Sequence, residues 1–148
     1  MKIAVILRQV PDLVEPLEVD DSGTALDFEE ASFLANETDE HALEQAILLK
    51  ESGGAEVTVV DPEGRREGEK LLPGVVWEED AYRAAEDADL VVILTEWNAF
   101  RALDLKRVAG AMRTPRLADF RNIYSAEDAR EAGFEAYAAV GRAEYGID

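Results

Sequence analysis

The segment DLVVILT, Asp89–Thr95, is the most continuous apolar run in this chain of 148 residues, and it decides the fold class. Its centre, Leu90–Leu94, has the length of a strand and is far shorter than the ~20 residues that cross a bilayer. Segments of similar character precede and follow it. The further strand predictions are Lys2–Val10 (KIAVILRQV), Glu56–Val60 (EVTVV), Val75–Trp77, Arg116–Phe120 and Phe134–Val140.

Helix signals alternate with these strands along the chain. Thr38 is the expected N-cap of a helix that ends at Gly53-Gly54, and Pro62 opens a helix through about Leu72. Three further helices are predicted at Asp80–Glu86, Phe100–Met112 and Ala126–Ala132. Such alternation favours a parallel sheet covered by helices on both faces. The sequence therefore predicts one three-layer, Rossmann-like α/β domain over residues 1–148. Its six-stranded, mostly parallel sheet is expected in the order 3-2-1-4-5-6, with a flavodoxin-like order as the alternative.

Residues 11–36 interrupt this alternation with a long loop that contains a predicted hairpin turn at Asp21-Ser22-Gly23. A loop of this length is uncommon within a compact domain and usually has a function. We expect a monomer, or a homodimer formed through this excursion. The apolar residues that would drive association are Leu13, Val14, Leu17, Leu26, Phe28 and Phe33.

The charge of the chain argues against several classes of partner. With 15 Lys plus Arg against 33 Asp plus Glu, the net charge is -18 at pH 7, and we find no basic patch in the sequence. Phosphate backbones and anionic lipid surfaces are repelled by such a chain, so we expect no nucleic acid and no membrane partner. No signal peptide or apolar span is seen, which predicts a soluble cytoplasmic protein.

The sequence offers few catalytic or metal-binding patterns. There is no cysteine, which excludes thiol catalysis and thiolate metal sites within these residues. No Gly-x-Gly-x-x-Gly segment or P-loop follows any strand, and the acidic clusters match no calcium loop. His41 is the one histidine and is interpreted as a surface residue. We therefore expect no metal site, no catalytic residue and no resident cofactor.

Residues 1–60 resemble the start of the electron transfer flavoprotein β subunit. The matching segments are Arg8-Gln9-Val10-Pro11-Asp12, Asn36-Glu37-Thr38-Asp39-Glu40 and Gly54–Val60 (GAEVTVV). The chain departs from that family at Arg8, where Lys is usual, and at Glu37, where Pro is usual. The resemblance implies a subunit that contacts AMP and helps to enclose an FAD held mainly by its partner, so FAD is not expected to bind this chain alone.

Residues from about 56 to 142 are similar to the C-terminal, UDP-binding domain of UDP-glucose 6-dehydrogenase. The segments that carry this resemblance are Asp61-Pro62, Leu94–Trp97 (LTEW), Phe100–Leu105 (FRALDL), Asp119–Tyr124 (DFRNIY), Ala132-Gly133-Phe134 and Gly141-Arg142. The resemblance places the NAD-binding fold, the nucleophilic cysteine and the acid/base groups of that enzyme outside the matching residues.

These two resemblances meet near Val60-Asp61. The charge changes at the same place, since residues 1–60 carry 14 acidic and 3 basic residues and residues 61–148 carry 19 and 12. We interpret the chain as a recombined or engineered chimeric α/β scaffold, with segments 1–60 and 61–148, that is not an enzyme. The alternative is a vestigial nucleotide-binding module for UDP or a UDP-sugar, with AMP less favoured.

A nucleotide site is expected where ligands of open parallel sheets bind, beyond the carboxyl ends of the first and fourth strands. Gln9 follows the first strand, and Thr95 and Glu96 follow the fourth. Arg121 is the principal candidate, because a guanidinium at a strand end can hold a phosphate bidentately and because the resemblance places this Arg at the UDP-sugar. Asn36 is added from the helix-start motif of the flavoprotein family, where a helix cap explains it equally well.

Overall fold

The fold is built on a six-stranded sheet in which every strand pair is parallel. In the computed structural model, all of residues 1–148 are described except 8, 13, 15, 25, 26, 28–30, 32, 36, 62–68, 70–73, 143 and 148. The spatial order is β5-β4-β1-β6-β7-β8, which is 3-2-1-4-5-6 when these strands are numbered along the chain. This confirms the predicted Rossmann-like order. The bounds are β1 Lys2–Ile6, β4 Glu56–Val60, β5 Val76–Glu78, β6 Leu90–Ile93, β7 Arg116–Asp119 and β8 Ala136–Ala139.

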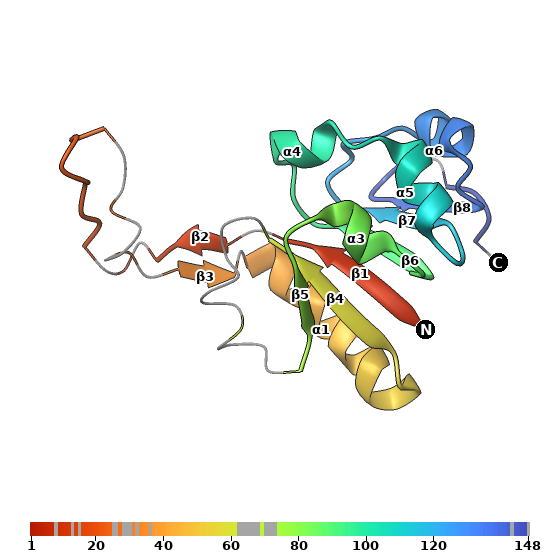
Figure 1. Cartoon of the computed structure of the whole chain (residues 1–148), viewed down its shortest axis with the longest axis horizontal. Coiled ribbons are helices and arrows are strands. Elements are labelled where there is room, and N and C mark those ends of the chain that lie inside the picture. The colour runs from red at the N-terminus through yellow and green to blue at the C-terminus, as the bar shows by residue number, and fades with distance from the viewer. Residues whose placement is uncertain are drawn as a thin grey trace.

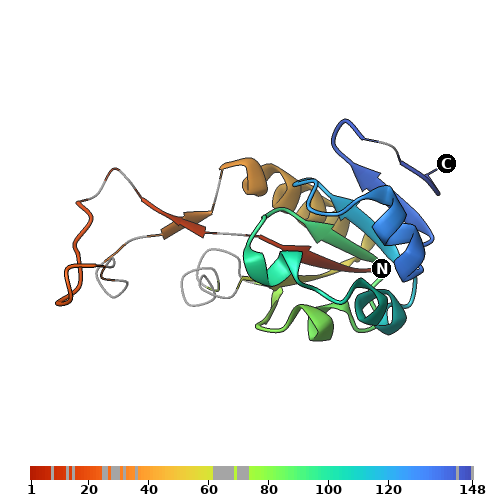
Figure 2. The same cartoon turned by 90° about the horizontal axis from the view of Figure 1, so that it is seen from above.

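Helices cover both faces of this sheet (Figures 1 and 2). The helix α1, Glu37–Gly53, packs on one face, while α3, Ala81–Ala85, α5, Leu105–Ala111, and α6, Ala126–Ala132, pack on the other. Successive side chains of a strand point to opposite faces, so β1 contributes to two cores. Ile3 and Val5 pack with Leu43 of α1, whereas Ala4 and Ile6 pack with the helices opposite. Among the helices that the structure describes, none is long and apolar enough to cross a membrane.

The predicted strand Lys2–Val10 is wrong in its extent, because it forms two separate strands. The strand β1 ends at Ile6, which lies in register with Val60 of β4 and Ile93 of β6, the last residues of both neighbours. The next strand, β2 (Gln9–Pro11), instead pairs antiparallel with β3 (Phe33–Ala35) in a sheet of two strands. A strand continues only while a neighbour offers backbone hydrogen bonds, and both neighbours of β1 end together.

The described residues between 9 and 35, which we call the arm, lie beyond the end of β1. Figures 1 and 2 show β2 and β3 projecting outward from the edge of the main sheet. Within the arm, the Asp27 amide donates to the Glu18 carbonyl at 2.9 Å, and the Gly23 amide donates to the Asp20 carbonyl at 2.9 Å. Gly23 has φ +68°, a conformation that glycine adopts without strain. The predicted turn at Asp21-Ser22-Gly23 is therefore confirmed.

Two helix predictions also need correction. The expected helix Phe100–Met112 is divided into α4, Asn98–Arg101, and α5, because Asp104 caps a new helix by accepting from the Arg107 amide at 3.1 Å. The first long helix begins at Glu37, so Thr38 lies inside its first turn rather than at the N-cap. The helix predicted from Pro62 to about Leu72 falls almost wholly on residues outside the described part of the chain.

The C-terminal segment covers part of the β8 edge of the sheet. Tyr145 and Tyr137 form an antiparallel bridge, with amide-to-carbonyl distances of 2.9 and 3.1 Å, and their rings stack with centroids 6.2 Å apart. The guanidinium of Arg130 lies 4.4 Å from the centroid of the Tyr145 ring. An edge strand exposes unpaired backbone groups, so this bridge removes part of one such edge from solvent.

Candidate functional site: the carboxyl-end edge of the sheet

Polar residues lie at or just after the carboxyl ends of three strands of the sheet, β4, β6 and β7. Asp61 follows β4, Thr95 lies two residues beyond β6, and Asp119 is the last residue of β7. All three are buried, with exposed fractions of 1%, 1% and 0%. Buried polar residues at the carboxyl ends of parallel strands are typical of the ligand edge of this fold. The candidate site is therefore built around the ends of β6 and β7.

Asp119 organises the turn that follows β7. Its Oδ1 accepts from the Arg121 amide at 3.1 Å, and its Oδ2 accepts from the Tyr124 amide at 2.8 Å. Between these residues, Asn122 has φ +56°, a left-handed conformation that is uncommon outside glycine, and its Nδ2 donates to the Val140 carbonyl at 3.1 Å. The buried carboxylate thus fixes the backbone from which the Arg121 side chain projects.

Arg121 reaches from the end of β7 to the residue that follows Thr95. Its Nε donates to Oε2 of Glu96 at 2.6 Å, and Nη2 contacts the same oxygen. The two side chains are about one-third exposed, at 32% and 33%. Nε of Arg101 in α4 donates to the Glu96 backbone carbonyl at 2.9 Å. Glu96 is therefore contacted by two guanidinium groups, by Arg121 at the carboxylate and by Arg101 at the main chain, and a guanidinium is a group that can bind an oxyanion.

Two buried polar atoms of this edge lack a hydrogen-bond partner among the residues described. They are Oγ1 of Thr95 and Oδ1 of Asn122. Leaving such atoms unpaired costs free energy, so a native structure usually pairs them with a protein group, a water or a ligand. Thr95 follows β6 and Asn122 follows β7, which are neighbouring strands. Thr95 is next to Glu96 in the chain, and Asn122 is next to Arg121. Their position is consistent with a site that a polar ligand completes.

Tyr124 links this edge to α4. Its hydroxyl donates to the Phe100 carbonyl, and its own carbonyl accepts from the Tyr137 hydroxyl at 2.9 Å. Burial raises the pKa of Tyr124 to about 12, with the negative charge of Asp119 nearby acting in the same direction. The phenol is therefore held neutral, as a hydrogen-bond donor that fastens the turn after β7 to the helix after β6.

The structure brings together three of the five predicted nucleotide-binding residues. Thr95, Glu96 and Arg121 lie at the ends of β6 and β7. Gln9 lies in β2 of the arm rather than at the end of β1, and Asn36 lies outside the described residues. Sequence reasoning missed Asp119 and Asn122 as structural parts of the site. The signal was present, because both belong to the Asp-Phe-Arg-Asn segment at 119–122 from which only the Arg was chosen.

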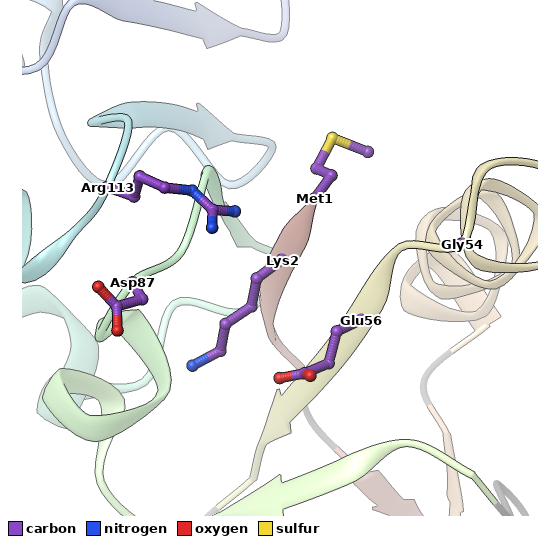
Figure 3. A pocket seen from close by; sticks show the side chains of 6 residues that line it. All are labelled: Met1, Lys2, Gly54, Glu56, Asp87 and Arg113. Carbon is purple, nitrogen blue, oxygen red and sulfur yellow. The ribbon is translucent and has the colours of Figure 1, made fainter.

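A cavity of about 420 Å³ lies at the opposite edge, by the amino ends of the strands. Figure 3 shows Lys2 and Glu56 extending from the neighbouring strands β1 and β4, with Arg113 across from them. The cations there are engaged, since Lys2 Nζ donates to the Glu86 carbonyl at 2.6 Å and Arg113 Nε donates to Asp89 at 2.8 Å. The hydrogen bonds from Arg113 and from the Lys2 amide hold the pKa of Asp89 well below its usual range. The charged groups of Lys2 and Arg113 are thus bonded to groups of the protein itself, so we assign this cavity no ligand.

Within the described part of the chain, no group of three or more His, Asp or Glu side chains could hold a metal ion. The site at the ends of β6 and β7 instead offers guanidinium groups, a hydroxyl and a carboxamide. These groups suit an anionic ligand that also carries hydroxyl or amide groups.

Comparison with known proteins identifies the family. The sequence model of the "UDP-glucose/GDP-mannose dehydrogenase family, UDP binding domain" matches residues 41–126, which is 86 of the 148 residues. The chain belongs to the UDP-glucose/GDP-mannose dehydrogenase family. The match covers most of α1 and then every strand from β4 to β7, together with the whole Asp119–Tyr124 turn. It therefore includes the Arg121–Glu96 pair and the groups around it.

Three individual relatives are UDP-glucose 6-dehydrogenases. The chain is 47% identical over 96 residues to a UDP-glucose 6-dehydrogenase of Rhizobium meliloti, which covers 65% of this chain and 22% of the relative. It is 50% identical over 64 residues to UDP-glucose 6-dehydrogenase 1 of Oryza sativa, covering 43% and 13%. UDP-glucose 6-dehydrogenase TuaD of Bacillus subtilis is 34% identical over 97 residues, covering 65% and 21%. The chain thus matches about a fifth or less of the length of these family members.

These findings correct two predictions. The interpretation as a designed or recombined scaffold without activity is wrong, because the family match begins at residue 41 and continues across Val60-Asp61 without a break. The expectation that the chain is not an enzyme is also contradicted, since its relatives are UDP-glucose 6-dehydrogenases, of which it matches a part. That expectation relied on the absence of cysteine from this chain. The absence concerns this chain alone and not the remaining length of the relatives. The resemblance of residues 1–60 to the flavoprotein β subunit is not shown by these comparisons and stays a prediction.

Proposed function

We propose that this chain is the UDP-binding part of a UDP-glucose 6-dehydrogenase and binds UDP or a UDP-sugar beyond the ends of β6 and β7. One observation carries the proposal: Arg121 projects from a turn fixed by Asp119 and lies against Glu96, within the segment that matches the family. A guanidinium held at a strand end is well suited to a diphosphate, because it offers several N–H donors in one plane.

In this proposal the diphosphate replaces the carboxylate of Glu96 as the partner of Arg121. The two side chains are one-third exposed, so an incoming phosphate can reach the guanidinium without unfolding the turn. Thr95 Oγ1 and Asn122 Oδ1 can then pair with ligand or with ordered water, which supplies partners for two buried atoms that have none among the described residues. Oxidation of the sugar is assigned to the complete dehydrogenase, of which this chain matches a minor part.

Calorimetric titration of the chain with UDP and UDP-glucose tests this proposal, with AMP and FAD as comparison ligands. We expect saturable binding of the two uridine nucleotides and a loss of about tenfold or more in affinity for Arg121→Ala, because a charged hydrogen-bond partner of the phosphate is removed. Arg116→Ala is the matched control, since Arg116 lies at the amino end of the same strand. Absence of heat with both uridine nucleotides, or equal loss in the two variants, would contradict the proposal.

A further inference from the structure

The C-terminal segment, the described residues between 140 and 147, folds back along β8. Tyr145 bridges Tyr137 through two backbone hydrogen bonds, and the Tyr145 hydroxyl donates to the Phe134 carbonyl at 3.2 Å. The guanidinium of Arg130 in α6 lies over the Tyr145 ring. Figure 1 shows the end of the chain beside β8. The later part of this segment is therefore fastened to α6 and to the amino-terminal half of β8, away from the candidate site.

The first part of the same segment contacts the turn that carries Arg121. Nδ2 of Asn122 donates to the Val140 carbonyl at 3.1 Å. Nη1 of Arg142 donates to the Tyr124 carbonyl at 3.4 Å. The turn after β7 therefore has two hydrogen bonds to the C-terminal segment, in addition to those that its amides donate to the carboxylate at the end of β7.

Tyr137 takes part in both sets of contacts. Its amide donates to the Tyr145 carbonyl at 2.9 Å, and its hydroxyl donates to the Tyr124 carbonyl at 2.9 Å. The Tyr137 side chain is 0% exposed, so water does not replace either partner while the chain is folded. A buried donor without a partner is costly, which keeps both bonds in place. The residue that anchors the C-terminal segment is thus also a donor to the turn.

The turn needs this support because of the backbone of Asn122. Its φ of +56° lies in the left-handed region, which costs free energy for residues other than glycine. The bond from its side chain to the Val140 carbonyl holds the residue in that conformation. When Val140 moves away, this bond is lost and the turn gains access to other conformations. Arg121, which directly precedes Asn122, then no longer has a fixed direction.

We propose that docking of the C-terminal segment positions Arg121, and that docking and anion binding at Arg121 strengthen each other. The coupling to a ligand rests on the proposed UDP site, whereas the positioning of the turn does not. A guanidinium that is already held in place loses less conformational freedom when it binds an anion. Coupling between two sites is reciprocal, so a ligand at Arg121 stabilises the docked segment by the same factor. Asn122, Tyr137 and Arg142 are accordingly positioning residues of the site.

A substitution far from the turn tests this coupling. Gly146→Ala displaces the C-terminal segment, because a Cβ at Gly146 would overlap the Glu135 carbonyl oxygen, and it removes no group from the candidate site. We call it the segment variant. Gly54→Ala is the matched control, since φ is +67° at Gly54 and +68° at Gly146. A Cβ on Gly54 meets no atom within 4 Å, and Gly54 lies at the opposite edge of the sheet.

Exchange of the Tyr137 amide with solvent shows whether the segment variant has released the C-terminal segment. If this amide stays protected, Tyr145→Pro takes the place of Gly146→Ala. Proline has no amide hydrogen, so this change removes the bond from the Tyr145 amide to the Tyr137 carbonyl.

Hydrogen exchange in the ligand-free protein is the first measurement. The amides of Arg121 and Tyr124 donate to the Asp119 carboxylate and report on the turn. We expect both to exchange about fivefold faster or more in the segment variant than in the control. The Leu7 amide, which donates to the Val60 carbonyl at 3.2 Å, is the internal reference for global opening. A released C-terminal segment with unchanged exchange at both amides of the turn overturns the proposal.

Calorimetric titration with UDP is the second measurement. We expect the affinity of the segment variant to be lower than that of the control by about fivefold or more, and saturating UDP to slow exchange of the Tyr137 amide in the wild-type chain. Equal affinities in the two variants overturn the coupling and leave the proposed function intact. A wild-type chain that binds no UDP contradicts the proposed function alone. The exchange of the Arg121 and Tyr124 amides then decides whether the C-terminal segment positions the turn.

Discussion

Arg121 donates from Nε to Oε2 of Glu96 at 2.6 Å, and this pair joins the end of β7 to the end of β6. The two residues are 25 positions apart in the chain. The pair makes Arg121 available at the ligand edge and at the same time supplies it with a competing anion. A phosphate that binds the Nε and Nη2 edge of the guanidinium has to displace the carboxylate first.

We predict that Glu96→Gln strengthens UDP binding. Removing the competing negative charge leaves Arg121 in place but weakens its present partner, and partly exposed ion pairs are worth up to about 1 kcal/mol, or roughly fivefold in affinity. Isothermal titration of both proteins under the same salt conditions measures the effect. Glu135→Gln, an exposed carboxylate elsewhere, is the control. A weaker affinity in Glu96→Gln would show that the carboxylate contacts the ligand instead of competing with it.

Replacement of Asp119 by Ala should destabilise the fold. This side chain is fully buried and accepts two backbone hydrogen bonds, from Arg121 and Tyr124, so its loss leaves two amides without their partner. We expect the free energy of unfolding to fall by about 2 kcal/mol or more. Urea denaturation followed by circular dichroism gives the change. If the loss does not exceed that of Glu135→Ala, the turn is not held by this carboxylate.

Stability should decrease in alkaline solution through Tyr124. Its pKa is raised to about 12 in the folded protein from an ordinary value of 10.0, because burial disfavours the phenolate. The stabilising effect is therefore complete below pH 10. It declines as the pH rises from 10 toward 12, because in this range the unfolded chain releases the proton while the folded chain still holds it. Tyr124→Phe should reduce this slope in urea titrations at successive pH values. The remaining slope includes Tyr137 and Tyr145, whose pKa values burial also raises. Identical slopes in both proteins would exclude Tyr124 as a source.

Two glycines with the same backbone conformation should respond differently to alanine. Gly141 and Gly146 have φ +67° and +68°. A Cβ on Gly141 meets no atom within 4 Å. Gly141→Ala should therefore lower the free energy of unfolding only by the cost of a left-handed backbone, about 1–2 kcal/mol. A Cβ on Gly146 would overlap the Glu135 carbonyl oxygen, so Gly146→Ala should displace the C-terminal segment as well.

Hydrogen exchange at the Tyr137 amide distinguishes the two variants. That amide donates to the Tyr145 carbonyl at 2.9 Å, a bond that only a correctly placed C-terminal segment can make. We expect faster exchange in Gly146→Ala and wild-type protection in Gly141→Ala. Equal protection in the two variants would mean that the segment adapts to the added methyl group.

The candidate site could be predicted only in part from the sequence. Arg121, Thr95 and Glu96 were identified because polar residues after apolar strands mark the ligand edge of a parallel sheet. Their mutual arrangement was not foreseen, since nothing local relates Arg121 to Glu96 rather than to any other carboxylate of an acidic chain. Gln9 was misplaced for a related reason. Whether a residue extends a strand or leaves it depends on where the neighbouring strands end, and β1 loses both neighbours after Ile6.

The sequence by itself determined the alternation of strands and helices, and with it the parallel sheet, because each short segment carries its own hydrophobic periodicity. It favoured the order 3-2-1-4-5-6 over a flavodoxin-like order, and the structure decided between the two. The tertiary structure alone decided that Asp119 fixes the Arg121 turn, that Glu96 is the partner of Arg121, and that the arm projects away from the sheet. The turn after β7 depends on the direction of the buried Asp119 side chain, and the Arg121–Glu96 pair joins residues 25 positions apart. The course of the arm depends on where both neighbours of β1 end, so none of the three features can be read from a short apolar pattern.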